Sequence, residues 1–385
     1  MRQKILIVCM FDSIHAGRWL SQFTNQDVEF VLFPSKKFKK IHPSLRLLTN
    51  NHSLASFKVA HPIKHLGILG YLDFAIFELI SRLFRGSLRV RYLRNILRKN
   101  KFDYVHALEI QGAGYLCDEA IKDKNFKLIL TNWGSDIFYF QHLPEHLPRI
   151  KSALVKADLY SAECNRDYKL AMDLGFKGTQ LPCIPNGGGF LESEILNIGI
   201  PTSERKNIVV KAYGGTFGRG DLAIQAVATV LADNNDLTAY FYSVTDDLIK
   251  SVTALVERFG DRVNYSTTKA PISHEELSYI FEKSRIYIGC SISDGISTSF
   301  LEALAKGVYP IQTNTSCAGE WIEKGAVASS INLDEDQLLT AIKQATCDDN
   351  FVDYAAKENF NVVDLCLRMN TVAPASFKFY EISEL

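Results

Sequence analysis

The stretch CSISDGISTSFLEALAKGVYPIQTNTSCAGEW, from Cys290 to Trp321, decides the fold prediction. It overlaps an apolar run, Arg285 to Cys290, that has the composition of a strand. A polar turn of small residues, Ser291 to Ser297, leads into a helix that ends at Gly307. Val308 to Thr313 has the composition of a second strand. This order predicts a strand–loop–helix–strand unit of an α/β fold.

The start of this helix is a candidate anion-binding turn. Backbone N–H groups in a first helical turn have no intrahelical partner, and the helix dipole adds to their attraction for an anion. Asp294 and Glu302 lie on either side of the turn, where their carboxylates would accept hydrogen bonds from hydroxyl groups, such as those of a sugar. The residues of the turn that we expect to contact the ligand are Gly295, Ile296, Ser297, Thr298 and Ser299.

A purely structural explanation stays open for the same residues. Ser299-Phe300-Leu301-Glu302 has the S-x-x-E pattern of a capping box. In a capping box, Glu302 would bond to the backbone at its own helix N-terminus and would contact no ligand.

The segment DGISTSFLEALAKGVYPI resembles the signature of the retaining family 4 glycosyltransferases, in which two Glu residues separated by seven positions precede small residues and a proline. In this sequence the first Glu is replaced by Asp294. The resemblance implies that Asp294 faces the donor sugar and that Glu302 faces the nucleotide ribose. It also implies an α/β fold of GT-B architecture, with two Rossmann-like domains that face each other across a cleft.

Size and composition limit the possible classes. A chain of 385 residues is too long for one ordinary core, so we expect two domains. The 43 Lys and Arg residues balance the 43 Asp and Glu residues, which gives no reason to expect nucleic acid. Eight scattered cysteines without a C-x-x-C pair are typical of reduced thiols. Because we find no secretory signal or uncharged membrane-length run, we expect a cytoplasmic protein.

The N-terminus has a Rossmann-like opening. The apolar strand Lys4 to Met10 is followed by a loop and a helix predicted from Arg18 to Phe23, without the G-x-G-x-x-G pattern of dinucleotide sites. FDSIHAGRW resembles the S-x-H-x-x-R-W opening of many family 4 members. The resemblance implies that His15, Gly17 and Arg18 line the acceptor cleft; by composition alone His15 and Arg18 would be surface residues.

Two further predicted strands end in candidate residues. DYVHAL resembles the D-x-V-H-A pattern of the family, which implies that His106 faces the cleft. KLILTN is followed by WGSDI, in which Trp133 replaces the His that many members carry. Asp136 lies at the carboxyl end of a strand, where open α/β sheets gather ligands. We therefore add Asp136 to Asp294 and Glu302 as a catalytic candidate.

A basic region extends from Lys64 to Lys101. Its only acidic residues are Asp73 and Glu78, and large apolar residues alternate with the basic ones. Arg82, Arg85 and Arg89 would share one helical face. Such a region suits the surface of an anionic membrane, which suggests peripheral association with the inner face of the cell membrane. An ordinary solvated helix face is the alternative.

The second domain is expected to follow a hinge near Pro185 to Pro201. Its first strand, Asn207 to Tyr213, leads into GGTFGRG, which resembles the G-R-x5-K-G pattern of the family. Arg219 takes the place of the Lys, with Gly214 where the family has Arg. The resemblance implies that Arg219 and the Gly215 turn contact the donor diphosphate, for which a guanidinium is well suited. A surface turn is the alternative.

These observations predict an acceptor-binding domain over residues 1–190, a donor-binding domain over 202–365, and a segment 366–385 that crosses back. The predicted protein is a retaining glycosyltransferase that uses a nucleoside diphosphate sugar and a glycan or lipid-linked acceptor, in surface polysaccharide or lipopolysaccharide synthesis. A sugar-nucleotide 2-epimerase or a non-catalytic sugar-binding protein are the alternatives. We expect no metal or other cofactor, because the D-x-D at Asp334 to Asp336 lies at a helix start, where it would act as a cap.

Overall fold

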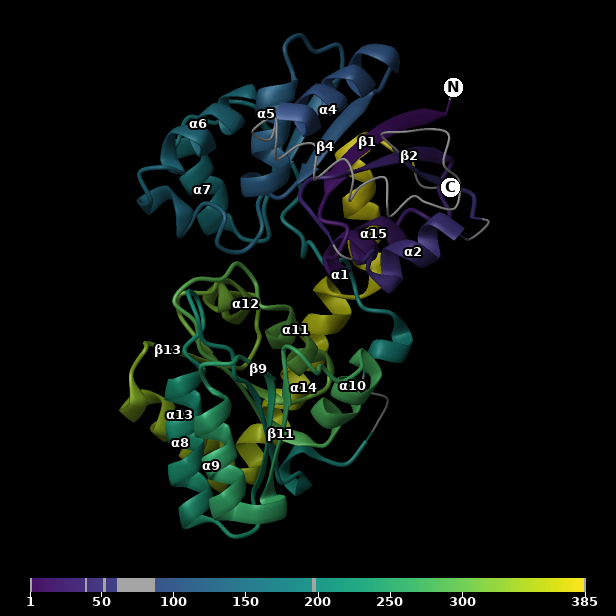
Figure 1. Cartoon of the computed structure of the whole chain (residues 1–385). Helices are drawn as coiled ribbons and strands as arrows, with labels where there is room; N and C mark the ends of the chain where they lie inside the picture. The colour runs from purple at the N-terminus through teal and green to yellow at the C-terminus, as the bar shows by residue number, and fades with distance from the viewer. Residues whose placement is uncertain (1, 39, 51–52, 61–86, 196–198, 384–385) are drawn as a thin grey trace. The chain divides into compact units, whose positions relative to one another are not determined.

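The computed structural model describes residues 2–38, 40–50, 53–60, 87–195 and 199–383 (Figure 1). The chain divides into two compact units. The first consists of Met1–Gly188 and Val372–Leu385, and the second of Gly189–Thr371. Residues 61–86, which hold much of the basic region predicted to bind membranes, lie outside the described residues.

The first unit contains a parallel sheet with the strand order β3-β2-β1-β4-β5-β6-β7 among the described residues. Ile5 to Cys9, in one of its inner strands, are apolar and buried on both faces, as expected of a parallel strand covered by helices. The strands are β1 (Gln3–Cys9), β2 (Val28–Pro34), β3 (Ser56–Val59), β4 (Tyr104–Leu108), β5 (Lys127–Thr131), β6 (Leu159–Ser161) and β7 (Thr179–Gln180).

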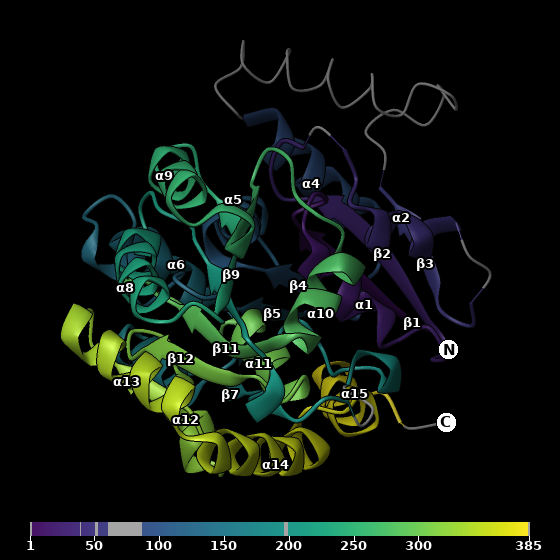
Figure 2. The same ribbon diagram turned by 90° about the horizontal axis from the view of Figure 1, so that it is seen from below.

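Helices cover both faces of this sheet (Figures 1 and 2). One face carries α1 (Ile14–Ser21), α2 (Pro43–Asn50) and the chain from α15 (Met369–Phe377) onward. The other carries α4 (Ser87–Lys99), α5 (Tyr115–Ala120), α6 (Leu147–Lys156) and α7 (Asn165–Asp173). Helix α1 begins four residues before the predicted start, because Ser13 caps it by accepting a hydrogen bond from the His15 N–H at 3.2 Å.

The C-terminal residues are anchored in the first unit by Tyr380. A hydrogen bond of 2.7 Å joins its hydroxyl to Nδ1 of His106, and the Trp19 indole N–H donates to the same hydroxyl at 3.3 Å. The second ring nitrogen of His106 lies 2.5 Å from Thr131 Oγ1. Burial lowers the pKa of His106 to about 3, so the ring is neutral at physiological pH.

The second unit repeats the same topology. Its strands are parallel, with the order β10-β9-β8-β11-β12-β13. Apolar residues of alternate strand positions, such as Ile208 and Val210, pack against helices of one face. The strands are β8 (Asn207–Lys211), β9 (Thr238–Val244), β10 (Val263–Thr267), β11 (Ser284–Gly289), β12 (Tyr309–Thr313) and β13 (Ser329–Ile331). Two parallel sheets with interleaved helices confirm the predicted α/β fold.

The helices of the second unit form the outer layers. Helices α8 (Gly220–Asp233), α9 (Ile249–Phe259) and α13 (Glu335–Cys347) cover one face, and α10 (His274–Glu282) and α11 (Thr298–Ala305) lie on the other (Figures 1 and 2). Helix α14 (Asp349–Cys366) packs against α11. Asp334 caps α13 by accepting from the Gln337 N–H at 2.8 Å, so the D-x-D pattern forms a helix cap as predicted.

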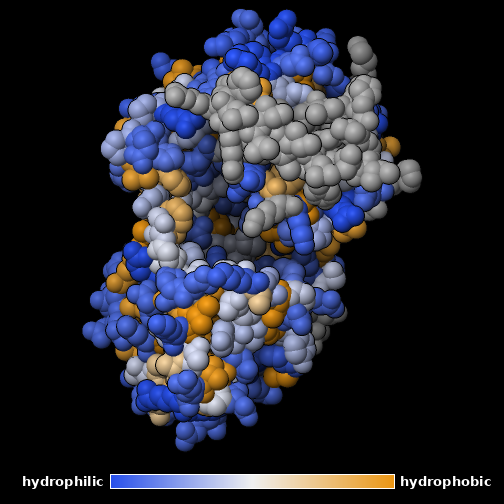
Figure 3. Space-filling view, in the orientation of Figure 1, coloured by the Kyte–Doolittle hydropathy of each residue, from blue (hydrophilic) through white to orange (hydrophobic). Residues whose placement is uncertain are grey.

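The surface and the cysteines are those of an ordinary globular protein. Figure 3 shows hydrophilic side chains over most of the visible face of the second unit, with hydrophobic ones in scattered spots. Among the described residues, we find no helix with the length and apolarity needed to cross a membrane. All eight cysteines are free thiols, and burial raises the pKa of Cys290 to about 12.

We expect Tyr380→Phe to lower the free energy of unfolding of the first unit by about 1–3 kcal/mol, because it leaves buried groups of His106 and Trp19 without a partner. Urea unfolding followed by tryptophan fluorescence measures the change. Tyr354→Phe is the matched control, since Tyr354 is 57% exposed. Equal stability of the two variants would contradict the anchoring role.

Candidate functional site

The strand order of the second sheet defines where a ligand is expected. The chain runs outward in one direction from β8 to β10 and in the other from β11 to β13, so the order reverses between β8 and β11. Open α/β sheets bind ligands outside the carboxyl ends of the strands at such a switch point. The loop after β8 contains GGTFGRG and the loop after β11 contains SISDGIS. Both predicted donor motifs therefore flank the switch point.

These two loops are joined by backbone hydrogen bonds. The Arg219 N–H donates to the Cys290 carbonyl at 2.9 Å, and the Ile292 N–H donates to the Phe217 carbonyl at 2.8 Å. Gly218 forms an isolated antiparallel bridge with Ser291, and a Cβ at Gly218 would overlap the backbone of Tyr213. The pairing holds Arg219 next to the loop that carries Asp294.

The structure contradicts the capping-box explanation for Glu302. Helix α11 begins after Ser297, which makes no side-chain capping bond, and Ser299 lies inside the first turn. A true capping box occurs one helix earlier, where the Ser273 hydroxyl accepts from the Glu276 N–H at 3.1 Å and Glu276 accepts from the Ser273 N–H at 2.8 Å.

Glu302 instead pairs with a histidine that the motifs did not single out. Oε1 of Glu302 lies 3.1 Å from Nε2 of His274, the first residue of α10. The Glu302 side chain is 16% exposed and that of His274 is 46% exposed. A small hollow with Leu277 and Phe281 in its wall adjoins the pair. His274 thus holds the Glu302 carboxylate at the edge of an apolar hollow.

Asp294 organises its own turn. Its Oδ1 accepts from the Gly295 N–H at 2.9 Å, and the Gly295 carbonyl accepts from the Cys317 N–H at 2.8 Å. The N–H of Gly295 is therefore occupied, unlike the expectation that it would bind an anion. Burial and then the charge of Asp294 raise the pKa of Tyr213, which places this phenol in the field of Asp294. Sequence motifs gave no signal for Tyr213.

Asp247 explains why glycine stands at position 214. An added Cβ at Gly214 would overlap the Asp247 carboxylate, which accepts from the Gly215 N–H at 3.2 Å. Hydrogen bonds from Thr245 and Gly215 lower the pKa of Asp247, so it is ionised at neutral pH. The arginine of the family pattern has no room here unless Asp247 moves. Nζ of Lys211, a cation at the end of β8, lies 4.9 Å from the Tyr213 ring centroid.

Two cleft predictions in the first unit are wrong. His106 is fully buried, with both ring nitrogens bonded to protein hydroxyls, so it has no atom to offer an acceptor. Gly17 is buried where α1 meets α2, and a Cβ there would overlap Ser44. The sequence patterns around His106 and Gly17 therefore reflect packing within the first unit. His15, edge-on to Trp133 at 5.5 Å between ring centroids, and Arg18 are partly exposed and stay predictions.

Asp136 has a structural role that the sequence did not indicate, and its catalytic role stays a prediction. Its Oδ2 accepts from the Ile110 N–H at 2.8 Å and from the Trp133 N–H at 3.0 Å. Burial, followed by the charge of Glu109, raises the pKa of Asp136 well above its usual range. The carboxyl group ties together the loops after β4 and β5, and burial disfavours its charged form.

Glu109 is a further buried acid that the sequence did not reveal. Its φ of 118° is unusual for a residue other than glycine. The carboxylate accepts from the Gly112 and Ala113 N–H groups, both at 2.6 Å. These bonds support a short π-helical turn, Ile110–Gly114, at the carboxyl end of β4. Strained backbone and π turns are concentrated at functional sites.

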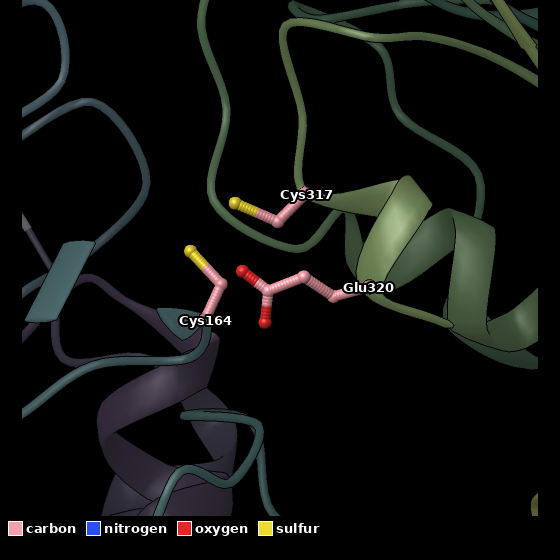
Figure 4. A group of neighbouring side chains, drawn as sticks. All are labelled: Cys164, Cys317 and Glu320. Carbon is pink, nitrogen blue, oxygen red and sulfur yellow. The ribbon is translucent and has the colours of Figure 1, made fainter. Parts of the chain in front are cut away.

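The segment after β12 ends in helix α12 (Ala318–Glu323), which Figure 4 shows with Cys317 before its first residue and Glu320 in its first turn. The Glu320 N–H donates to the Cys317 carbonyl at 3.1 Å. Cys164, drawn in the same figure, precedes α7 of the first unit and is buried. The start of α12 also contacts the Asp294 turn, because the Cys317 N–H donates to the Gly295 carbonyl.

Comparison with solved structures defines the fold. The fold is that of GT-B glycosyltransferases, with two Rossmann-like domains. Sucrose-phosphate synthase from Thermosynechococcus elongatus has a TM-score of 0.70 at 13% identity, over 99% of this chain and 98% of that one. Anabaena HepE, solved with UDP-glucose, has a TM-score of 0.72 at 13% identity over 99% and 100%. A glycosyltransferase from Rickettsia africae has a TM-score of 0.68 at 11% identity over 99% and 98%.

Residues 4–164 match the family model described as glycosyl transferase 4-like. The match lies in the first unit, whereas the strongest motif resemblance lies in the second. It confirms the resemblance to family 4 glycosyltransferases. A search of curated proteins found no match.

We expect Asp136→Asn to gain stability relative to the native chain as pH rises. Folding raises the pKa of Asp136. The stability that this group contributes is therefore fully present below its unfolded pKa of about 3.9, and it is lost as pH rises through the folded-state pKa. Asparagine keeps the shape without ionising. Between about pH 5 and about pH 8, the free energy of unfolding of the variant should rise relative to the native chain by about 1 kcal/mol or more. Chemical unfolding at several pH values measures this difference.

Asp123→Asn is the matched control, because it makes the same substitution at an exposed position. A difference for Asp136→Asn that stays constant or falls with pH would contradict the assignment of a raised pKa.

Proposed function

We propose that this protein is a glycosyltransferase that moves a sugar, with retention, from a nucleoside diphosphate sugar to a glycan or lipid-linked acceptor. The observation that carries the proposal is the paired loops at the switch point of the second sheet. They place Arg219 beside the Asp294 turn. Glu302 follows that turn within the next helix.

Each of these groups has a defined task in the proposal. When the bond between the sugar C1 and the diphosphate oxygen breaks, negative charge grows on the leaving group. Arg219 and the first-turn N–H groups of α11 stabilise that charge without requiring a metal. Gly295 and Gly215 use their N–H groups within the protein, so the proposed backbone donors are Ile296, Ser297, Thr298 and Ser299.

The two carboxylates recognise hydroxyl groups on either side of the diphosphate. Asp294 accepts hydrogen bonds from the donor sugar, and Glu302 accepts them from the ribose. The pairing with His274 supports the role of Glu302, because it fixes the carboxylate before the ligand arrives. Since Asp is shorter than the family Glu, the sugar would approach the backbone of the Asp294 turn more closely.

The first unit would bind the acceptor, with His15 and Arg18 as proposed contacts. Its family 4-like sequence supports this division of labour. The proposed setting is surface polysaccharide or lipopolysaccharide synthesis at the inner face of the cell membrane, and the basic residues of the first unit suit an anionic acceptor or surface.

We expect Glu302→Gln and Asp294→Asn each to lower kcat/KM for the donor by about 10–100-fold, because each removes a carboxylate that accepts hydrogen bonds from hydroxyl groups of the bound donor. Steady-state transfer from a radiolabelled nucleotide sugar measures the loss. Glu323→Gln, an exposed acid on the neighbouring helix α12, is the matched control.

Near-native turnover of both variants would overturn the proposed site. Donor consumption at an equal rate with and without acceptor would instead favour an epimerase. The position of the sugar label in the product distinguishes the two, since transfer joins the label to the acceptor and epimerisation leaves it on the nucleotide.

We expect nucleoside diphosphates to raise the melting temperature of the native chain and to have less effect on Arg219→Ala. A ligand that binds the folded state stabilises it by mass action, by about 2.7 kcal/mol at 100 times its Kd. A thermal-shift screen over nucleoside diphosphates and their sugars tests this and identifies the base. Arg258→Ala, which removes an exposed arginine of α9, is the control. Equal shifts in all three proteins would remove Arg219 from the donor site.

A further inference from the structure

The first unit contains a cavity that its motifs did not predict. It has a volume of about 320 Å³ and lies beyond the carboxyl ends of β2 and β4. The loop after β2 supplies Lys36 and Lys37, helix α4 supplies Arg89, and helix α6 supplies Arg149. The volume is far above the about 30 Å³ of one water molecule and reaches the lower range of ligand pockets.

The lining carries an excess of positive charge. Four cationic side chains face one carboxylate, that of Glu119, which pairs with Arg149 at 2.8 Å. Asp12, outside the cavity, approaches Lys36 only to 4.0 Å, and both of those side chains are well exposed. Behind the lining, the buried Glu109 carboxylate also interacts with Lys36, and burial raises the pKa of Glu109, which disfavours its charged form. An anion in the cavity would therefore meet more positive than negative charge.

Part of this lining is fixed in place before any ligand arrives. The Arg149 guanidinium lies 4.0 Å from the ring centroid of Tyr115, and Glu119 holds it there. On the adjacent wall, the Gln111 amide donates to the Asp136 carbonyl at 2.8 Å. Gln111 belongs to the π turn that the Glu109 carboxylate supports.

Arg89 is the cation that burial affects most. Burial lowers the pKa of its guanidinium to about 10, so the protein interior disfavours its charged form. A bound anion would offset that cost. By contrast, Arg91 and Arg98 of the same helix are exposed and do not line the cavity.

We propose that this cavity binds a phosphate or diphosphate group through Lys36, Lys37, Arg89 and Arg149. The inference rests on the proposed function in one respect, which is that the molecule carrying the phosphate is the acceptor. That acceptor would be either a phosphorylated glycan or a lipid-linked glycan whose headgroup carries the phosphate. Such binding would hold the acceptor through its phosphate and leave its hydroxyl groups free to react. The cavity therefore narrows the acceptor class to molecules with an exposed phosphate group.

Isothermal titration of the full-length chain with inorganic pyrophosphate tests the proposal. Lys37→Gln/Arg89→Gln should weaken binding by about tenfold or more, whereas Arg91→Gln/Arg98→Gln should weaken it by less than about threefold. Both double variants remove two charges from the same region, so the comparison separates the cavity from diffuse attraction. Circular dichroism and the melting temperature confirm that each variant is folded.

Equal weakening in both double variants, or no binding to the native chain, would overturn the proposal. Because pyrophosphate can also occupy the proposed donor site, the titration is repeated on Arg219→Ala, and binding that this variant retains is assigned to the cavity. If the variant instead abolished the signal, pyrophosphate would occupy the donor site, and the cavity proposal would fail while the proposed function stood. Conversely, a failed transfer assay would leave the titration unaffected.

Vesicles of phosphatidylcholine and phosphatidylglycerol identify the source of the phosphate. Competition between these vesicles and pyrophosphate, lost in Lys37→Gln/Arg89→Gln, would support a lipid headgroup. Pyrophosphate binding that the vesicles leave unchanged would support a phosphorylated glycan.

Discussion

The pairing of the loops after β8 and β11 is the constraint on which the candidate site depends. Two backbone hydrogen bonds, from Arg219 to Cys290 and from Ile292 to Phe217, join segments more than 70 residues apart in the sequence. They form because parallel strands next to each other deliver their following loops to the same edge of the sheet. Without this pairing, the Arg219 guanidinium and the Asp294 turn would have no fixed relation to each other.

The first unit uses its buried polar groups for a different purpose. His106, Asp136 and Glu109 all lie at or after the carboxyl ends of strands, where catalytic residues are commonly found, yet each is satisfied by protein donors or acceptors. Burial keeps His106 neutral and raises the pKa of both acids. These groups shape loops, whereas we propose that the cationic side chains around the neighbouring cavity bind a ligand. A polar residue at a strand end therefore does not by itself indicate a catalytic role.

Much of the fold was predictable from local sequence. Apolar runs such as that of β1 and helix signals such as that of α13 depend on neighbouring residues, and the structure places both within a residue or two of the expected bounds. The family motifs also located Arg219 and Glu302 on the correct elements. The capping explanation of Glu302 could not be excluded from sequence, because S-x-x-E describes a true box at Ser273 and a false one at Ser299 equally well.

The sequence by itself determined the α/β class, the repeated strand–helix order and the positions of the two motifs predicted to bind the donor, because hydrophobic periodicity and turn residues act over short distances. Tertiary structure alone decided which residues meet. It brought His274 to Glu302, set Asp247 against Gly214, buried His106 under Tyr380, and gathered Lys36, Arg89 and Arg149 around one cavity. Those contacts form between side chains of elements that are far apart in the sequence, and a local sequence pattern does not specify such contacts.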